Sequence, residues 1–189
     1  MRYLAIATAY DGTLTKTGRL SADVLSALER LRDSGRRAIL VTRRPFHDIA
    51  WACPRLELFD YVVAESGAVL HRPAAWETIV QSGRRGASSA SAVQRALREM
   101  RVPAEQLVAI GAEPGDDGFL ALAGFPVATA DASRVVKRRA KFVTRGSAGS
   151  GVVELIDELL RDDLRQVVSS VRKMSWTNAL SAGSQSTST

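Results

Sequence analysis

A polar turn follows the first apolar run of the chain, in the order Ala9-Tyr10-Asp11-Gly12-Thr13. Asp11 carries a carboxylate, and a positioned carboxylate can donate or accept a proton during catalysis. Asp before Gly is also a common turn pair, because the carboxylate bonds its own backbone. The residue types therefore leave two interpretations of Asp11 open, an acid–base group and a turn former.

Two further polar segments also come directly after apolar runs. Thr42 and Arg43 follow the run 38–41, and Asp116 closes the segment Gly-Ala-Glu-Pro-Gly-Asp after the run 107–110. A hydroxyl and a guanidinium can bind an anion such as phosphate, whereas a carboxylate can hold a cation. The alternatives are that Thr42 and Arg43 are solvated surface, and that Asp116 begins a helix whose dipole favours an acid.

The elements that must position these residues are predicted from the alternation of short β-rich runs with helical patterns. Strands are expected over 3–8, 38–41, 61–64, 107–110, 125–128 and 142–143, with 68–70 folding back beside the third. Helices are expected after Ser21, over 46–51, around 93–100, over 116–123, after Ser133 and from 152 onward. The alternation predicts a three-layer α/β/α sandwich with a mostly parallel Rossmann-like sheet, which binds ligands at the carboxyl ends of its strands.

Two stretches lack such a pattern. Residues 72–91 are small and basic, and we expect a loop or a shortened insertion there. From Ser175 onward the chain is mostly Ser, Thr, Gly and Ala, which bury too little apolar surface to become ordered. We therefore expect one domain over 1–174 and a flexible tail over 175–189.

The motifs resemble those of the haloacid dehalogenase (HAD) superfamily of phosphohydrolases, in its Cof-like branch. The turn 9–14 resembles the signature D-x-D-G-T, with Ala9 in place of the first Asp. Thr42 matches the phosphate-binding Thr or Ser of the family, and 59–68 is similar to a stretch containing V-A-E-N-G-A. The segment 110–116 aligns with the metal loop G-D-x-x-N-D. The resemblance runs from 2 to roughly 164, and four segments in the right order make it specific.

The resemblance implies a chemistry for each matched position. In the family a carboxylate nucleophile attacks the phosphoryl group, and a second Asp two residues on serves as general acid and base. Mg²⁺ takes oxygen ligands from the nucleophile, a backbone carbonyl and an Asp of the last loop. Asp11 is thus the implied acid–base position, Thr42 and Arg43 the phosphate-binding positions, and Asp116 a metal position.

The chain departs from the family pattern at the residues that carry the chemistry. Ala9 stands at the nucleophile position, Ser89 at the position of the motif Lys, and Ala112 at the first Asp of the metal loop. Arg43 replaces the Gly that usually follows the Thr. A methyl group can neither attack phosphorus nor ligate a metal. We therefore expect a pseudo-phosphatase, a catalytically deficient homologue that serves as a binding or assembly module and needs no cofactor.

Two alternatives from other classes stay open. The first is an active Mg²⁺-dependent phosphohydrolase that recruits Glu113, Asp116 or Asp117 to the lost positions. The second is a nucleic-acid-associated protein, because the formal net charge is +6. The basic residues are scattered, however, and lack the interleaved aromatic residues typical of single-strand binders.

The resemblance also implies how the site is covered. Cof-like relatives carry a large cap domain, and 72–91 is too short to hold one. We expect the open carboxyl edge to be covered by a second copy or a protein partner, through an apolar patch of Phe46, Ile49, Trp51 and Leu56. The single cysteine excludes an internal disulfide, and no apolar run reaches the roughly 20 residues of a membrane span. These absences predict a cytoplasmic protein.

Overall fold

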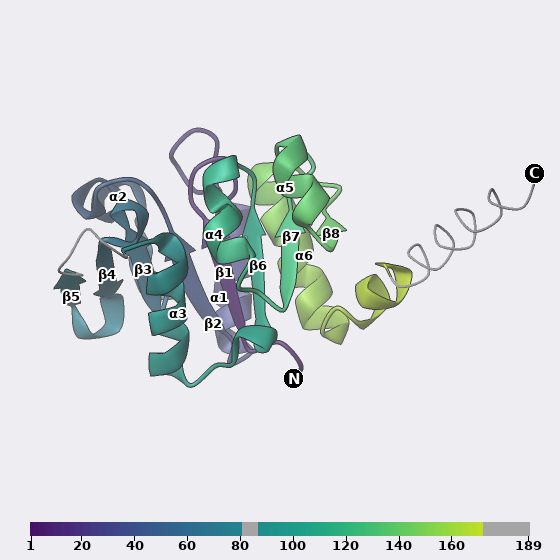
Figure 1. The fold of residues 1–189 in the computed structure, drawn as a ribbon, viewed down its shortest axis with the longest axis horizontal. Coiled ribbons are helices and arrows are strands. Elements are labelled where there is room, and N and C mark those ends of the chain that lie inside the picture. The colour runs from purple at the N-terminus through teal and green to yellow at the C-terminus, as the bar shows by residue number, and fades with distance from the viewer. Residues whose placement is uncertain (81–86, 172–189) are drawn as a thin grey trace, which may run out of the picture.

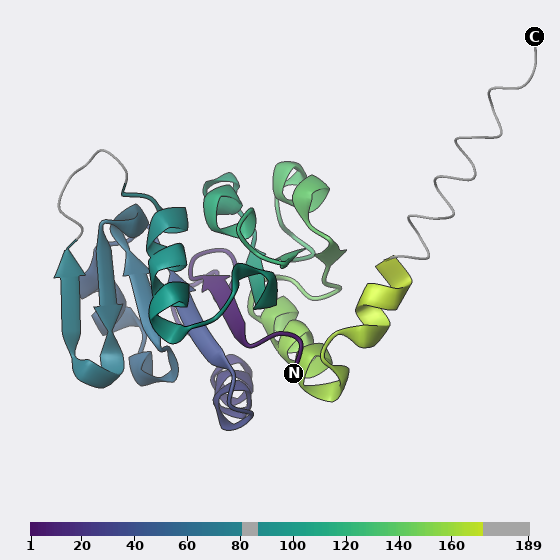
Figure 2. The same cartoon turned by 60° about the horizontal axis from the view of Figure 1, so that its bottom comes forward.

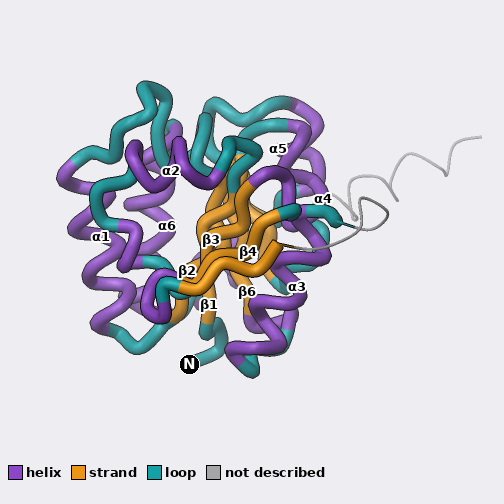
Figure 3. Tube along the Cα trace, turned by 90° about the vertical axis from the view of Figure 1, so that its left-hand side faces the viewer, coloured by secondary structure: helices purple, strands orange, loops and turns teal. Residues whose placement is uncertain are grey.

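The computed structural model describes residues 1–80 and 87–171, which form one mixed sheet with helices on both faces (Figures 1 and 3). The strand order is β5-β4-β3-β2-β1-β6-β7-β8. The strands are β1 (Ala5–Ala9), β2 (Arg37–Val41), β3 (Tyr61–Ala64), β4 (Val69–Arg72), β5 (Glu77–Val80), β6 (Leu107–Gly111), β7 (Phe125–Ala128) and β8 (Phe142–Val143).

Helices form the outer two layers of the sandwich. They are α1 (Ala22–Asp33), α2 (Phe46–Ala52), α3 (Ser89–Met100), α4 (Asp117–Leu120), α5 (Arg134–Arg139) and α6 (Ala148–Asp162), and a further helical segment covers 165–171. The buried side chains of α1, α2 and α6 belong to one apolar cluster, and those of α3, α4 and α5 belong to the other. The sheet lies between the two groups (Figure 3), which confirms the predicted three-layer architecture.

The topological switch point of the sheet, where the strand order reverses, lies beside β1. β1 pairs in parallel with both β2 and β6, so the chain crosses to one side of β1 first and to the other side later. β3 and β4 pair antiparallel, as do β4 and β5, and the remaining pairs are parallel. Ligand sites in such sheets lie at the carboxyl ends of the strands where the order reverses.

The side chains of β1 alternate between the two cores. Ala5, Ala7 and Ala9 pack in the cluster that contains Val93 of α3, whereas Ile6 packs in the other. Two of the predicted helix starts are confirmed by their caps, because the Ser21 and Ser133 side chains accept hydrogen bonds from the first turns of α1 and α5. A side-chain oxygen at this position satisfies a backbone N–H that the helix itself cannot.

The interval 72–91 differs from the expected loop. Residues 77–80 form β5, which pairs with β4 and ends the sheet (Figure 2), and α3 begins at Ser89. The β-branched residues Thr78, Ile79 and Val80 favour an extended backbone. Residues 81–86 and the predicted tail 175–189 lie outside the described residues. Across the two described ranges, no helix combines the length and apolarity that crossing a bilayer requires.

The expected apolar patch after β2 does not form. Ile49 and Leu56 are buried in the core, and Phe46 is only partly exposed, whereas Trp51 is 90% exposed. Trp51 lies two residues after Ile49, which places the two side chains on opposite sides of a helix with 3.6 residues per turn. One isolated tryptophan therefore remains where four apolar residues were expected.

Candidate functional site

A small pocket opens at the carboxyl ends of β1 and β2, beside the loop after β6 and the start of α3. It is lined by Ala9, Tyr10, Asp11, Val41, Thr42, Arg43, Ser89, Gly115 and Asp116. The space open to the centre of a water molecule is ≈ 10 Å³, roughly enough for one water. The structure thus brings together all five sequence-predicted site positions, with Ser89 at the position of the motif Lys.

The turn after β1 is built by backbone hydrogen bonds around Gly12. The Gly12 N–H donates to Thr15 O at 2.8 Å, and the Leu14 N–H donates to Tyr10 O at 3.0 Å. Gly12 has φ +71°, in the left-handed region that favours glycine. Ala9, which the resemblance places at the family's nucleophile position, is buried directly before this turn.

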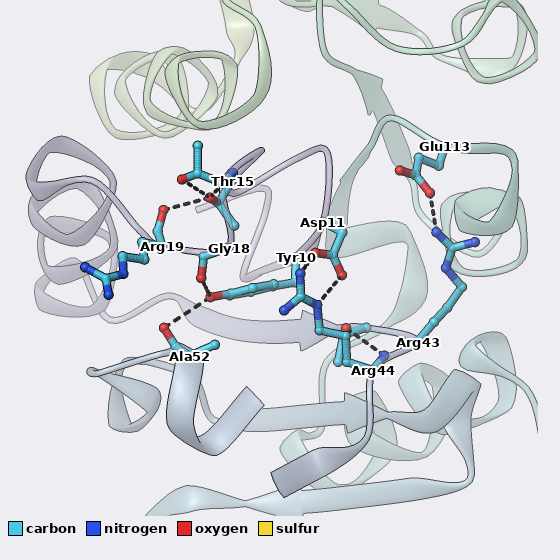
Figure 4. A network of polar contacts seen from close by, with 11 residues as sticks. Tyr10, Asp11, Thr15, Gly18, Arg19, Arg43, Arg44, Ala52 and Glu113 are labelled. Carbon is cyan, nitrogen blue, oxygen red and sulfur yellow. Dashed lines mark hydrogen bonds and ion pairs between the residues drawn. The ribbon is translucent and has the colours of Figure 1, made fainter. Parts of the chain in front are cut away.

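Asp11 is held by Arg44 in a two-pronged ion pair (Figure 4). Arg44 Nε donates to Asp11 Oδ2 at 3.0 Å, and Arg44 Nη2 donates to Oδ1 at 2.5 Å. The bonds to Asp11 raise the pKa of the Arg44 guanidinium above its ordinary value. Both oxygens of the predicted acid–base group therefore already accept a hydrogen bond from a fixed cation.

Tyr10 supports the same arginine from the core side. Its hydroxyl donates to Gly18 O at 2.8 Å, and burial raises the pKa of Tyr10 to about 12 (Figure 4). The Arg44 guanidinium lies 5.5 Å from the centre of the Tyr10 ring, within the range of a cation–π contact. Arg44 is thus positioned by two consecutive residues of the turn after β1.

Arg43 points to the other side and bonds Glu113, in the loop after β6 (Figure 4). A Cβ placed on Gly115 would lie 3.3 Å from Arg43 Nη1, so the guanidinium also lies close to this loop. Arg43 lines the pocket, and its side chain is exposed. The predicted phosphate-binding position thus carries a cation that is paired within the chain.

The Asp116 side chain stabilises the conformation of the loop after β6. Its Oδ2 accepts hydrogen bonds from the N–H groups of Ala112 and Glu113, both at 2.9 Å. Burial raises the pKa of Asp116, although the two backbone donors act in the opposite direction. The predicted metal carboxylate therefore has one oxygen committed to the backbone of its own loop.

Thr42 is buried, and its hydroxyl also serves the local backbone. Its Oγ1 accepts a hydrogen bond from the Arg44 N–H at 3.1 Å, and its own N–H donates to Val63 O at 2.8 Å. The Ser66 N–H donates to Thr42 O at 3.3 Å. These bonds fix the backbone position from which the side chains of Arg43 and Arg44 extend.

The turn η2 (Glu65–Gly67), after β3, connects the site loops, a role that sequence motifs did not indicate. Glu65 Oε1 accepts from the N–H of Phe46, which caps α2 where Pro45 offers no side-chain cap. Gly67 has φ +98°, and a Cβ there would lie 2.2 Å from the Ser88 carbonyl. Only glycine allows this approach, which seats the start of α3 beside the pocket.

The donor set does not fit Mg²⁺. Neither alanine at the family's carboxylate positions offers an oxygen ligand from its side chain. Asp117 does not line the pocket and pairs with Arg139 at 2.8 Å. In the part of the chain that the structure describes, no group of three or more His, Cys, Asp or Glu side chains could hold a metal ion. Asp11, Glu113 and Asp117 form ion pairs with arginines instead, and sequence reasoning missed these partners.

The fold and the position of this pocket define a hydrolase-type α/β protein, and the chain belongs to the haloacid dehalogenase-like hydrolase family. The family model matches residues 6–83 and 74–156. This confirms the resemblance found in the sequence motifs. The two matched segments overlap over 74–83, within the interval where the sequence resemblance places the cap of Cof-like relatives.

Individual relatives agree with this assignment. A phosphoglycolate phosphatase from Methanothrix thermoacetophila is 31% identical over 75 residues, 40% of this chain. The match spans only 34% of that enzyme's length. A haloacid dehalogenase-like hydrolase from Bacteroides thetaiotaomicron superimposes with a TM-score of 0.73 at 15% identity, covering 83% of this chain and 99% of the other. One from B. subtilis gives 0.72 at 16% identity, with 82% and 99% covered. These structural likenesses concern the fold.

Proposed function

We propose that this chain is a pseudo-phosphatase, a family member without phosphatase activity that serves as a binding or assembly module. The observation that carries the proposal is Ala9, which lies at the end of β1 and lines the pocket without a carboxylate. Loss of a catalytic nucleophile lowers enzymatic rates on the order of 10⁴- to 10⁶-fold.

The engagement of the neighbouring carboxylates supports the proposal over an active enzyme with recruited acids. Asp11 is paired with Arg44, and Glu113 is paired with Arg43. Asp116 bonds two backbone N–H groups of its own loop. A replacement nucleophile would have to leave one of these partners before it could attack a phosphoryl group.

The assembly part of the proposal commits to a second copy of this chain as the partner. Only residues 73–88 separate β4 from α3, and they include β5, so a cap of domain size has no room there. Trp51 and Trp76 are 90% and 76% exposed, and tryptophan is enriched among the residues that dominate binding energy at interfaces. Self-association would shield these indole rings from water.

Among the described residues, the basic pairs 36–37 and 43–44 give no support to nucleic-acid binding. Arg36 pairs with Asp163 and Arg37 pairs with Asp60. The two arginines after Thr42 are paired as well. Pairing within the chain reduces the positive potential that would attract phosphate backbones.

A phosphatase assay tests the proposed function. We expect the purified protein to hydrolyse p-nitrophenyl phosphate in the presence of Mg²⁺ no faster than a buffer control. The variant Asp11→Asn serves as the comparison, because it removes the implied acid–base group. Mg²⁺-dependent turnover that purifies with the protein and disappears in Asp11→Asn would overturn the proposal.

A further inference from the structure

The helix α5 and the two residues after it carry a dense run of positive charge. Residues 134–141 contain three arginines and two lysines and no acidic residue. Four of these basic residues are exposed, namely Arg134, Arg138, Arg139 and Lys141. Within the described ranges, Arg139 is the one member of this basic run with a carboxylate partner, which is Asp117 of α4. The rest of the charge is therefore left without an opposite charge from the chain itself.

Arg134 and Arg138 lie on the outer face of α5. Val136, two residues from each of them, is fully buried in the core. A helix with 3.6 residues per turn therefore directs both arginines toward solvent. The two side chains are neighbours at spacing i,i+4, where like charges destabilise a helix. Neither guanidinium has a hydrogen-bond or ion-pair partner among the residues that the structure describes, so the fold does not account for this pair.

An apolar cleft lies beside the basic run, between α4 and α5 (Figure 1). Its volume is ≈ 320 Å³, within the range of clefts that bind ligands. Apolar side chains such as Leu120, Pro126 and Val136 line it, together with the charged residues Asp117, Arg139 and Lys141. The ion pair of Arg139 with Asp117 balances two of these charges, which leaves the ammonium of Lys141 unbalanced. The cleft thus combines an apolar lining with a net positive charge.

We propose that this cleft and the basic run 134–141 together bind an acidic segment of a protein partner. An apolar side chain of that segment fills the cleft, and its carboxylates pair with the arginines. Charge complementarity selects this partner, because guanidinium groups match carboxylates in geometry and arginine clusters recognise acidic motifs. The cleft favours a peptide over single-stranded nucleic acid, since no aromatic residue is among its described lining residues and such strands bind by stacking their bases on aromatic rings.

This acidic-peptide surface is separate from the other proposed sites. The cleft shares no lining residue with the pocket at the ends of β1 and β2, as far as the described residues show. α5 lies near β7 and β8 at one end of the sheet, whereas Trp76 directly precedes β5 at the other end (Figure 1). Peptide binding therefore depends neither on phosphatase activity nor on self-association through the tryptophans.

A fluorescence anisotropy titration tests this surface with a defined probe. The probe is a short labelled peptide of aspartate and glutamate around one central leucine, and the protein is the full chain. We expect saturable binding at low salt that weakens as NaCl is added, because salt screens exposed charges. The variant Arg134→Gln/Arg138→Gln should bind at least about fivefold more weakly, since it loses two ion pairs with the peptide.

The apolar cleft is tested separately from the charges. Replacing the leucine of the peptide with alanine should weaken binding about tenfold, because less apolar surface is buried. The variant Ala121→Phe should have a similar effect. Ala121 is exposed and lines the cleft, so a phenyl ring there occupies the space without changing the charge.

A matched variant and a second probe separate this surface from general charge effects. Arg19→Gln/Arg98→Gln removes the same charge from two exposed arginines that lie on other elements and have no ion pair in the described chain. This control should bind the peptide within about twofold of the wild type. A single-stranded RNA of the same charge should bind the wild type more weakly than the peptide does.

Four results would overturn the proposal: no saturable peptide binding by the wild type at low salt, equal losses in the α5 variant and the control, an alanine peptide that binds as well as the leucine peptide, or tighter binding of RNA through the same arginines. Circular dichroism checks that the variants are folded. If the α5 double variant is not, the single variant Arg138→Gln replaces it. A smaller loss of affinity is then expected, and no loss refutes the proposal.

Discussion

Arg44 and Asp11 meet fork to fork, with both oxygens of the carboxylate accepting from one guanidinium. The two residues come from the loops after β2 and β1, which are adjacent strands of the sheet. Their ion pair therefore joins two loops that the sheet brings to the same edge. Asp11, to which the resemblance assigns proton transfer, therefore stabilises the contact between these two loops.

Restoring the nucleophile alone should not restore activity. In Ala9→Asp, the new carboxylate faces the charge of a phosphate dianion without a metal ion or the motif lysine, and electrostatic stabilisation is usually the largest catalytic term. We expect no Mg²⁺-dependent hydrolysis of p-nitrophenyl phosphate above the wild-type level.

The smallest set of changes with a physical basis for activity is Ala9→Asp, Ser89→Lys and Ala112→Asp. It is best made together with Arg43→Gly, which returns the family's small residue next to Thr42. An Ala9→Asp single variant that turns over substrate rapidly would show that the remaining residues of the pocket still form a working site.

Gly67→Ala should destabilise the fold by about 2–4 kcal/mol in urea unfolding, because it combines a left-handed backbone with a collision against Ser88. Gly35→Ala is the matched control. Gly35 has φ +80°, and nothing lies within 4 Å of a Cβ placed there. The control should lose only the left-handed penalty, about 1–2 kcal/mol. Equal losses at the two positions would contradict the close approach.

His71 should make stability fall as the solution becomes acidic. The ring is buried between Phe46 and Trp76, with Nδ1 2.8 Å from Thr78 Oγ1, and burial lowers the pKa of His71 below 6.5. The unfolded chain then binds a proton more readily than the folded one. The contribution of His71 is therefore fully present above pH 6.5 and is lost as the pH falls from there toward the folded-state pKa.

The variant His71→Gln tests this pH dependence. Urea unfolding of both proteins is compared from neutral pH to below pH 6.5. We expect the free energy of unfolding to fall more steeply in the wild type, so that the gap between the two proteins narrows in acid. Parallel curves would show that His71 does not titrate differently in the folded protein.

Trp51→Ala should separate assembly from stability. The side chain is 90% exposed, so its removal should change the free energy of unfolding by less than about 0.5 kcal/mol. Light scattering at micromolar concentration should detect weaker self-association than in the wild type. A wild-type protein that stays monomeric at every concentration would contradict self-association.

The order of strands and helices could be predicted from sequence because the central strands are short, apolar and fully buried, with helices of matching amphipathic pattern between them. β5 could not, since its four residues are mostly exposed and carry no alternation that marks one buried face. The exposure of Trp51 and the burial of Ile49 could not be predicted either. The helix α2 is short, so its sequence has too few turns to show which face is buried.

The location of the candidate site was predictable, but its internal partners were not. Motif spacing brought Asp11, Thr42 and Asp116 to one edge of the sheet, since strand ends of a parallel sheet meet there. The opposite directions of Arg43 and Arg44 depend on side-chain packing across three loops. Sequence showed a dibasic pair and several acids, and only the folded chain shows which groups meet.

The contact between Gly67 and Ser88 makes this point of the fold an insertion point. The strands β4 and β5 lie between these two residues in the sequence, and the backbones of Gly67 and Ser88 approach each other closely. Loop-closure entropy rises slowly with length, by about 0.6 kcal/mol for each doubling. Because the two ends of this segment already meet, residues added between β5 and α3 do not require β1, β2 or β3 to move. A domain can therefore be gained or lost at this position without rearrangement of the central strands.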